Sequence, residues 1–455
     1  MGKSLSRNIA GKGFSISVFN RHVDGSEVDV AKTFAAEHAE MNETLAFDDL
    51  KGFVESLAVP RKVFLMVNAG AAVDSVIGQL CEYLSQGDVI IDGGNSHYKD
   101  TERRFHDLKE KGIQYIGTGV SGGEEGALKG PSIMPGGSKE AFDLVAPILQ
   151  SIAAKDSGGT DCCAFIGKGG SGHFVKMVHN GIEYAEMQFI AEVYAVLRYT
   201  MSKSPEEISS IFSEWLKTDM TSYLLEITAD ILREKEGEKF LIDLILDKAG
   251  NKGTGSWTTI AACELGVAIP TLTAALFARY QSSQLDTRLK ASEVYASANV
   301  DLELDLDILR QAYQLARIVN HHQGYDLIAT ASENYHWDIN YSDLSRIWTN
   351  GCIIRSSLME QISKAELQEG SILLNPQLNA EILQTRNALN DLSVLLAKTQ
   401  ISAPCILSAL SYLNGFTEKR SLAHIIQAQR DYFGAHTYER VDAPRGEKFH
   451  TNWLS

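Results

Sequence analysis

The sequence predicts an α/β domain with a parallel sheet, followed by a large all-helical domain and a short C-terminal tail. Strand-like and helix-like segments alternate over the first third of the chain. From about Gly172 onward, long amphipathic patterns dominate and strand signals vanish. The length of 455 residues also exceeds one ordinary hydrophobic core, which indicates two or three domains.

Four short apolar runs are predicted to form strands, at residues 14–19, 62–67, 88–91 and 114–117. Helical patterns lie between them, for example at 71–84 and 101–111. Because helices alternate with these strands, we expect a parallel sheet with helices on both faces.

The first predicted element is a helix at residues 3–10, with no strand and no complete glycine-rich turn before it. A dinucleotide-binding fold places its first strand and that turn immediately before such a helix. Only Gly2 stands where the last glycine of the turn would be. We therefore expect the sheet to lack its central strand, which would leave two strand edges unpaired.

The second half of the chain is predicted to be helical, with examples at residues 175–198 and 205–216. A weak internal echo hints at a duplicated helical unit, because residues 211–227 and 347–362 each place a tryptophan before a Ser-x-Leu triplet. The final stretch, residues 427–455, is rich in aromatic and polar side chains, which favours a docking segment.

Composition excludes several classes of protein. The formal net charge is −16, and such a surface repels nucleic acids and anionic membranes. No apolar run is long enough to span a bilayer, and residues 1–8 lack the apolar stretch of a signal peptide. The six cysteines are scattered without a CxxC ladder, which favours a reduced intracellular protein.

Two glycine-rich segments of the first domain are candidate ligand loops. Residues 92–95 (DGGN) follow a predicted strand, where open sheets bind ligands. Residues 121–137 are dense in glycine, which permits close approach of the backbone to a ligand. Glycine also serves ordinary turns, but two such loops in one domain favour a site.

A cluster of polar residues is predicted on one helix face. Lys176, His179, Asn180 and Glu183 are spaced i, i+3, i+4 and i+7, amid apolar neighbours that indicate burial. Buried polar groups need partners or a function, so this face is a candidate acid–base site. A solvated surface face with the same residues remains the alternative.

Three further features suit anionic ligands. The loop at residues 251–255 (NKGTG) offers a cation and a hydroxyl. Arg279 lies in an apolar run and needs a counter-ion, either a carboxylate of the protein or a phosphate of a ligand. Asn20 and Arg21 follow Gly2 at roughly the 20-residue distance at which such folds meet the adenosine ribose. An arginine there suits a 2′-phosphate, although a surface arginine at a strand end is the simpler explanation.

Five segments in this order resemble the 6-phosphogluconate dehydrogenase family: GVSGGEEGALKGPSIMPGG, GHFVKMVHNGIEY, NKGTGSW, FARY and QAQRDYFGAHTY. The resemblance extends over the whole chain. It implies NADP-dependent oxidation of 6-phosphogluconate at its C3 hydroxyl, a step of the pentose phosphate pathway. The 3-keto acid then loses carbon dioxide, and the resulting enediol becomes ribulose 5-phosphate. No metal is implied.

The resemblance also implies residue roles and an organisation. Lys176 is expected to be the general base and Glu183 the acid that protonates the enediol. The expected domains are a Rossmann-like NADP-binding domain (1–170), a helical substrate and dimerisation domain (171–426) and a tail (427–455) that reaches the partner subunit of a cytoplasmic homodimer. The residues expected to bind substrate are Asn95, Ser121, Gly122, Gly123, His179, Asn180, Tyr184, Lys252, Thr254, Arg279, Arg430 and His436. Those expected to bind NADP are Gly2, Asn20, Arg21, Val67 and Asn95.

The chain departs from the family at three points. The first strand and its turn are not present before Gly2, and we hypothesise an N-terminally truncated form. His22 stands where the family usually has Ser or Thr, and Asn68 where a lysine is usual. Two alternatives stay open: another β-hydroxyacid dehydrogenase, such as one acting on hydroxyisobutyrate, or a non-catalytic homologue that dimerises or binds substrate.

Overall fold

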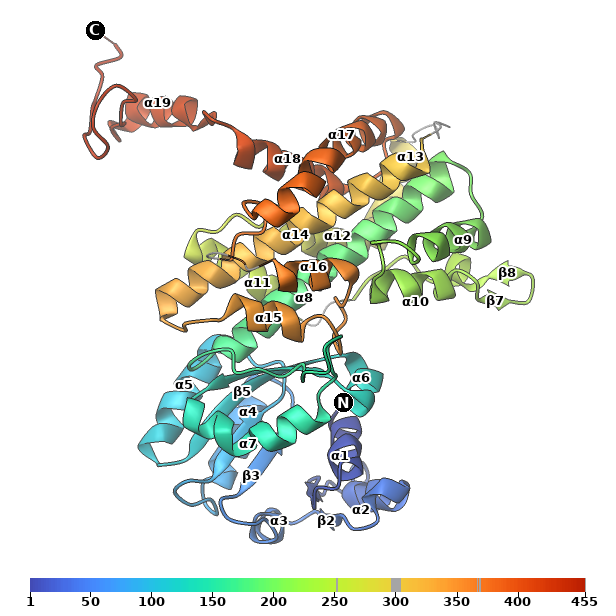
Figure 1. Ribbon diagram of the computed structural model, residues 1–455, viewed down its shortest axis with the longest axis vertical. Coiled ribbons are helices and arrows are strands. Elements are labelled where there is room, and N and C mark those ends of the chain that lie inside the picture. The colour runs from blue at the N-terminus through green and yellow to red at the C-terminus, as the bar shows by residue number, and fades with distance from the viewer. Residues whose placement is uncertain (251–252, 296–303, 366, 368–369, 455) are drawn as a thin grey trace. The chain divides into compact units, whose positions relative to one another are not determined.

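The computed structural model describes residues 1–250, 253–295, 304–365, 367 and 370–454. Contacts divide the chain into two compact units, Met1–Ala409 and Leu410–Ser455. The first unit contains an α/β region followed by a helical region (Figure 1), as the sequence predicts.

A four-stranded sheet forms the centre of the α/β region, in the order β3 (Lys62–Leu65), β4 (Val89–Asp92), β5 (Gln114–Ser121) and β6 (Ser132–Gly137). The first three strands are parallel, and β6 runs antiparallel to β5. The strands predicted at 62–67, 88–91 and 114–117 are confirmed as β3, β4 and β5.

A separate two-stranded parallel sheet pairs β1 (Ser17–Phe19) with β2 (Leu45–Phe47). Among the described residues no strand pairs with both β1 and β3, so the two sheets stay separate. The gap lies where the sequence predicts that the central strand is lacking. Side chains connect the two sheets through α3 (Leu50–Glu55): Phe19 and Phe47 pack on Phe53, at ring-centroid distances of 5.6 and 6.3 Å. Phe53 in turn shares a core cluster with Val63 and Leu65 of β3.

The extent of the sheet corrects two sequence predictions. The strand expected at 114–117 continues to Ser121, and β6 lies inside the stretch 121–137 that was predicted to be a ligand loop. β2 was not predicted, because three residues give little periodicity. Glycine usually weakens strands, but β5 and β6 use their glycines for close packing against a helix, as described below.

Helices cover both faces of the four-stranded sheet. On one face Val89 and Ile91 pack with Leu5 and Leu149, and on the other Ile90 packs with residues that include Val73 and Leu108. This alternation is the period-2 pattern of a strand buried on both sides. The α/β helices are α1 (Gly2–Gly11), α2 (Val30–Ala36), α3 (Leu50–Glu55), α4 (Ala71–Leu80), α5 (Tyr98–Glu110), α6 (Gly123–Lys129) and α7 (Lys139–Ile152), with a 3₁₀ turn at Ala39–Met41.

The helical region is built around two long helices that lie side by side, α8 (Ser171–Ala195) and α14 (Leu306–Tyr335) (Figure 1). A π-helical turn, Val196–Thr200, extends α8. One small hairpin, β7 (Lys235–Glu236) with β8 (Lys239–Phe240), is an exception to the prediction that strands vanish here. The remaining helices are α9 (Pro205–Trp215), α10 (Tyr223–Ile231), α11 (Thr254–Leu265), α12 (Pro270–Ser282), α13 (Leu285–Val294), α15 (Tyr341–Ile347), α16 (Ser357–Lys364), α17 (Pro376–Thr399) and α18 (Pro404–Thr417), with a 3₁₀ turn at Leu241–Leu244.

The two segments of the internal echo contact each other. Ser222 and Ser356 form an isolated antiparallel bridge, and each serine caps the helix that follows it, α10 and α16. The tryptophans of the echo, Trp215 and Trp348, are both buried. This matched arrangement supports a duplicated helical unit.

A buried carboxylate caps the start of α18. Both oxygens of Glu192, in α8, accept backbone N–H groups, from Cys405 and Ile406, at 2.9 Å each. These N–H groups have no partner within their own helix, and Pro404 ahead of them has no N–H to satisfy. Burial raises the pKa of Glu192 to about 7, against the lowering effect of the two amides.

The C-terminal unit contains the end of α18 and α19 (Ala423–Gly434). The segment after α19 folds around Asp431, whose carboxylate accepts the backbone N–H groups of Thr437 and Thr451 and the indole N–H of Trp453. A tail with this many internal hydrogen bonds is ordered around one buried acid.

Candidate active site

Helix α8 lies almost in backbone contact with the sheet. A Cβ on Gly119 of β5 would come within 2.4 Å of the Cβ of Lys176, and a Cβ on Gly136 of β6 within 2.4 Å of the backbone N of Gly172. Real Cβ atoms do not approach so closely, so glycine is required at both positions. These two glycines therefore allow α8 to pack closely enough to bring Lys176 onto the sheet.

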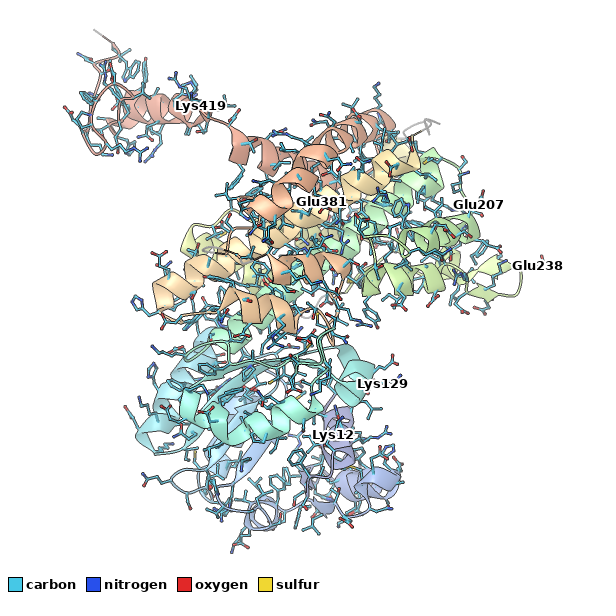
Figure 2. All side chains as sticks on the ribbon, viewed as in Figure 1. Lys12, Lys129, Glu207, Glu238, Glu381 and Lys419 are labelled. Atoms are coloured by element: carbon cyan, nitrogen blue, oxygen red, sulfur yellow. The ribbon has the colours of Figure 1, made fainter. Side chains whose placement is uncertain are left out.

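The proposed base sits in a buried polar cluster. Lys176 is 6% exposed, in contrast to charged side chains such as Lys129 and Glu207, which lie on the exterior (Figure 2). Its Nζ donates to Oδ1 of Asn180 at 2.5 Å and lies 3.5 Å from Oγ of Ser121. The predicted helix face is thus buried, and the alternative of a solvated face is wrong for Lys176 and Asn180.

His179 completes this cluster. Its Nδ1 lies 3.4 Å from Nζ of Lys176, and its Nε2 lies 3.3 Å from Oγ of Ser121. Burial lowers the pKa of Lys176 below its ordinary value and the pKa of His179 well below its own. The ammonium of Lys176 lowers the pKa of His179 further. The surroundings therefore favour neutral forms, which suits a lysine that must accept a proton.

The next turn of α8 carries the expected acid, Glu183, and Tyr184, on which an arginine of α12 stacks. Oε2 of Glu183 lies 3.8 Å from Nδ1 of His179, and the carboxylate is partly open to solvent. The guanidinium of Arg279, from α12, lies 3.4 Å from the ring centroid of Tyr184. Arg279 also donates to the carbonyl of Gly250 at 3.2 Å. Glu183 is near enough to act on the Arg279 charge and raises the pKa of Arg279, against the lowering effect of burial.

The loop that follows β4 is held in place by Asp92, the last residue of that strand. This buried carboxylate accepts from Ser96 at 2.6 Å, Tyr115 at 2.8 Å and the backbone N of Gly94 at 3.1 Å. The loop carries Asn95 to a small cavity of 10 Å³ where α8 and α11 converge. The residues around this cavity are Asn95, Ser96, His173, Lys176, Met177, Asn180, Thr254 and Trp257.

Four of these residues were not predicted: Ser96, His173, Met177 and Trp257. His173 precedes Lys176 by one helical turn, and this spacing could have placed it on the same face. Trp257 follows Thr254 by three residues, so the same helical spacing could have placed both on one face of α11. Its ring meets His97 edge-on at 5.1 Å, beside the ion pair of Lys99 with Glu264 at 2.7 Å.

Residues expected to bind a dinucleotide lie at two places. Gly2, the first residue of α1, packs against Met66 at the end of β3, where a Cβ would be 3.2 Å from that of Met66. The carbonyl of Val67 lies 2.9 Å from where a Cβ of Gly94 would be, so these two loops meet. Asn20 and Arg21 lie elsewhere, at the carboxyl end of β1.

The remaining predicted residues are distributed as follows. Gly122 and Gly123 begin the α6 region directly after Ser121, and both have positive φ. A Cβ on Gly122 would collide with the carbonyl of Gly351 at 2.6 Å. Lys252 lies outside the described residues. Arg430 and His436 are exposed in the C-terminal unit.

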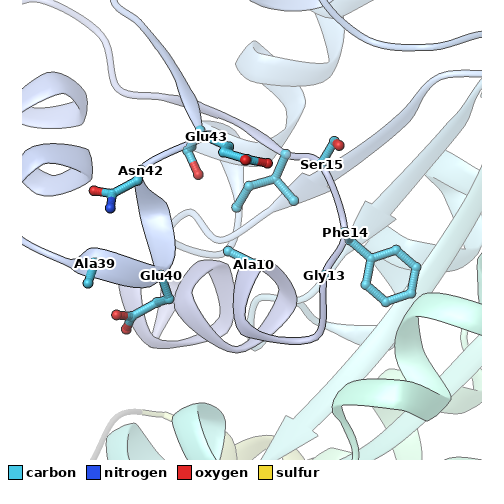
Figure 3. A pocket seen from close by; sticks show the side chains of 10 residues that line it. Ala10, Gly13, Phe14, Ser15, Ala39, Glu40, Asn42 and Glu43 are labelled. Carbon is cyan, nitrogen blue, oxygen red and sulfur yellow. The ribbon is translucent and has the colours of Figure 1, made fainter.

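A second cavity of 320 Å³ is lined by the end of α1, by the segment that precedes β1 and by residues of the stretch 39–44 (Figure 3). Its walls include Ala10, Phe14, Glu40, Asn42 and Glu43. Two carboxylates make this lining unsuitable for the phosphates of a dinucleotide.

In the part of the chain that the structure describes, no group of three or more His, Cys, Asp or Glu side chains could hold a metal ion. Within those residues no helix is long and apolar enough to cross a membrane.

Comparisons with known proteins agree over the full length. Residues 1–167 match the domain family described as the NAD binding domain of 6-phosphogluconate dehydrogenase, and residues 172–453 match its C-terminal domain. The chain is 44% identical to the decarboxylating 6-phosphogluconate dehydrogenase of Klebsiella pneumoniae, covering 100% of this chain and 97% of that protein. It is also 44% identical, with the same coverage, to an NADP(+)-dependent, decarboxylating enzyme of Bacillus subtilis. The structure of the Plasmodium falciparum 6-phosphogluconate dehydrogenase superimposes with a TM-score of 0.94 at 38% identity, covering 100% of this chain and 98% of that one.

Proposed function

Since this chain belongs to the 6-phosphogluconate dehydrogenase family, we propose that it oxidatively decarboxylates 6-phosphogluconate to ribulose 5-phosphate and carbon dioxide with NADP. The observation that carries the proposal is the buried Lys176, whose Nζ is held by Asn180 and Ser121. Oxidation of a hydroxyl group in a sugar acid needs a general base, and a neutral amine at this buried position can serve as that base.

In the proposed reaction, neutral Lys176 takes the proton of the C3 hydroxyl as the substrate is oxidised. NADP, when bound, supplies the hydride acceptor. The 3-keto acid then loses its carboxylate as carbon dioxide, and the ammonium of Lys176 assists by donating its proton toward the developing enediol oxygen. Glu183, two turns further along α8 from Lys176, protonates the enediol carbon to give the ketone product.

The substrate is held by groups of matching charge and shape. Ser121, His179 and Asn180 surround Lys176 and suit the hydroxyls and carboxylate of the sugar acid. Arg279, a planar guanidinium stacked on Tyr184, suits the phosphate. Thr254 borders the same cavity as Lys176 and Asn180. We assign Asn95, Gly122, Gly123 and Lys252 to the same site.

The residues present fit the adenosine end of the cofactor, and the loops after β3 and β4 offer further contacts. Asn20 and Arg21 offer amide and guanidinium donors to a 2′-phosphate. Gly2 presents the N-terminus of α1, where backbone N–H groups favour an anion. Val67 and Asn95 border the loops after β3 and β4, at the carboxyl ends of the parallel strands where such ligands bind.

We further propose a cytoplasmic homodimer with domains at residues 1–170, 171–426 and 427–455. The tail would bring Arg430 and His436 to the partner subunit's site. Support comes from exposed apolar side chains on α19, such as Ile426 at 59% and Phe433 at 71%, which a partner surface would cover. The six cysteines are all free thiols, which fits a reducing compartment.

The direct experiment is to measure NADPH formation and carbon dioxide release from 6-phosphogluconate with this chain. We expect both products in equal amounts. Turnover of hydroxyisobutyrate in place of 6-phosphogluconate would favour the other β-hydroxyacid dehydrogenases. Binding of 6-phosphogluconate without turnover would instead favour the non-catalytic homologue, for which the interruption between β1 and β3 is the supporting feature.

A further inference from the structure

The residues expected to meet the cofactor's 2′-phosphate already hold an acidic side chain. The carboxylate of Glu27 accepts a hydrogen bond from Nδ2 of Asn20 at 3.0 Å. It also accepts two from Arg21, through Nε and Nη2, at 3.3 Å each. Both donors thus converge on one carboxylate, with the two oxygens facing the guanidinium fork.

The backbone holds Glu27 in this position. Val23 and Glu27 exchange two backbone hydrogen bonds, at 3.0 and 2.8 Å, and close a tight turn. Gly25 within the turn has a φ of 75°, which glycine adopts without strain. The approach of Glu27 to Arg21 therefore follows from the turn and not merely from a flexible surface side chain.

The charges at this turn are mutually stabilised but open to solvent. The hydrogen bond from Arg21 holds the pKa of Glu27 below its ordinary value, and Glu27 raises the pKa of Arg21. The side chains are 74% exposed for Arg21 and 35% for Glu27. A neighbouring pair, His22 Nε2 with Asp24 Oδ1 at 3.0 Å, adds a second carboxylate to the same turn.

We propose that Glu27 is a specificity-determining residue for the 2′ position of the nicotinamide cofactor, and that it lowers the preference for a 2′-phosphate over a free 2′-hydroxyl. This inference rests on the proposed NADP-dependent function. It concerns how strongly the chain discriminates between the two cofactors, and it leaves the reaction unchanged.

The physical reason is competition for the same donors. A 2′-phosphate must share Asn20 and Arg21 with Glu27 or displace its carboxylate, and two anions on one guanidinium repel each other. A free 2′-hydroxyl can donate a hydrogen bond to the carboxylate, as acids at this point of dinucleotide folds do. Because the site is exposed, we expect Glu27 to change the ratio of affinities by roughly tenfold at most.

The test compares binding of adenosine 2′,5′-bisphosphate with binding of 5′-AMP, which differ only in the 2′-phosphate, by titration calorimetry on the full chain. In Glu27→Gln we expect the bisphosphate to bind several-fold more tightly, up to roughly tenfold, and 5′-AMP to bind equally or more weakly. The gain should shrink as salt is raised, because exposed charges are screened. Glu27→Ala should behave in the same way, which guards against a contact peculiar to the glutamine amide.

Glu37→Gln is the matched control, since it removes the same charge from an exposed position at the end of α2. Equal effects of Glu27→Gln and Glu37→Gln would overturn the inference, because the cause would then be net charge. Weaker binding of the bisphosphate to Glu27→Gln would also overturn it, because Glu27 would then be orienting Arg21 for the phosphate. In both cases turnover of NADP by the unaltered chain would leave the proposed function intact. Failure of the unaltered chain to bind either nucleotide or to reduce NADP would overturn both.

Discussion

The Nζ of Lys176 lies 3.4 Å from Nδ1 of His179, one turn further along α8. Two cations at this separation in a buried site would repel each other strongly. Burial alone already lowers the pKa of both groups. The Lys176 ammonium lowers the pKa of His179 further, so His179 stays neutral, and burial makes Lys176 give up its proton more readily than a lysine at the surface.

The rate should depend on pH through Lys176. Because the neutral amine is the reactive form, kcat/KM for 6-phosphogluconate should rise with pH as Lys176 loses its proton, at a midpoint below the ordinary 10.5. Lys176→Arg should lower kcat by roughly 10²–10⁴-fold, since a guanidinium does not deprotonate in proteins. Initial rates across pH test both points. Lys129→Arg, at an exposed position, is the control and should leave the profile unchanged.

Arg279 should act mainly on binding of the phosphate. Arg279→Lys replaces a planar fork stacked on Tyr184 by a point charge, so we expect KM for 6-phosphogluconate to rise roughly 10- to 100-fold with a smaller change in kcat. Steady-state kinetics measure this split, with exposed Arg233→Lys as the control. An equal loss with unphosphorylated gluconate would contradict a role at the phosphate.

Gly119 should be essential for the close packing of α8 against β5. A Cβ there would lie 2.4 Å from the Cβ of Lys176, so Gly119→Ala must push the helix from β5. We expect a loss of roughly 1–3 kcal/mol in the free energy of unfolding, together with reduced kcat. Gly78→Ala, in α4, is the matched control, because a Cβ there meets nothing within 4 Å. It should stabilise the protein by roughly 0.5–1 kcal/mol without changing activity. Urea unfolding and rate assays decide.

Glu192 should make stability depend on pH. Its pKa is raised from 4.5 to about 7, so between these values the folded protein keeps a proton that the unfolded chain has released. The free energy of unfolding should therefore fall as pH rises through this interval, by roughly 3 kcal/mol. Above pH 7 the contribution should become constant.

Glu192→Gln tests this linkage. The variant should lose roughly 1–3 kcal/mol throughout, because one of the two capped N–H groups of α18 loses its acceptor. It should also lose the pH-dependent fall. Urea titrations across the interval measure both, with exposed Glu226→Gln as the control. An unchanged pH dependence in Glu192→Gln would assign the fall to another group.

Local spacing was enough to predict the buried polar face of α8. Lys176, His179 and Asn180 share a face because helical geometry fixes which positions are neighbours, and apolar flanks indicated burial. The strands β3, β4 and β5 were likewise predicted from contiguous apolar runs. These features depend on a few adjacent residues, and such information is present in the sequence itself.

Contacts between distant segments were beyond that reasoning. Ser121 meets Lys176 because Gly119 of β5 and Gly136 of β6 let α8 approach, and the glycines of residues 121–137 made β6 look like a loop. Trp257 reaches the site from another helix. Glu27 meets Arg21 through a tight turn whose closure depends on backbone hydrogen bonds that spacing does not reveal.

The break between β1 and β3 has a consequence for local opening. Backbone hydrogen bonds hold β3 to β6 together, but the β1–β2 pair joins them through side chains such as Phe19 and Phe47 on Phe53. Segments without a shared ladder can unfold as separate cooperative units. Amide hydrogens of β1 and β2 should therefore exchange with solvent faster than those of β4 and β5. A nucleotide bound at Asn20 and Arg21 would slow exchange in the first pair, so cofactor affinity and the ordering of that small sheet are thermodynamically linked.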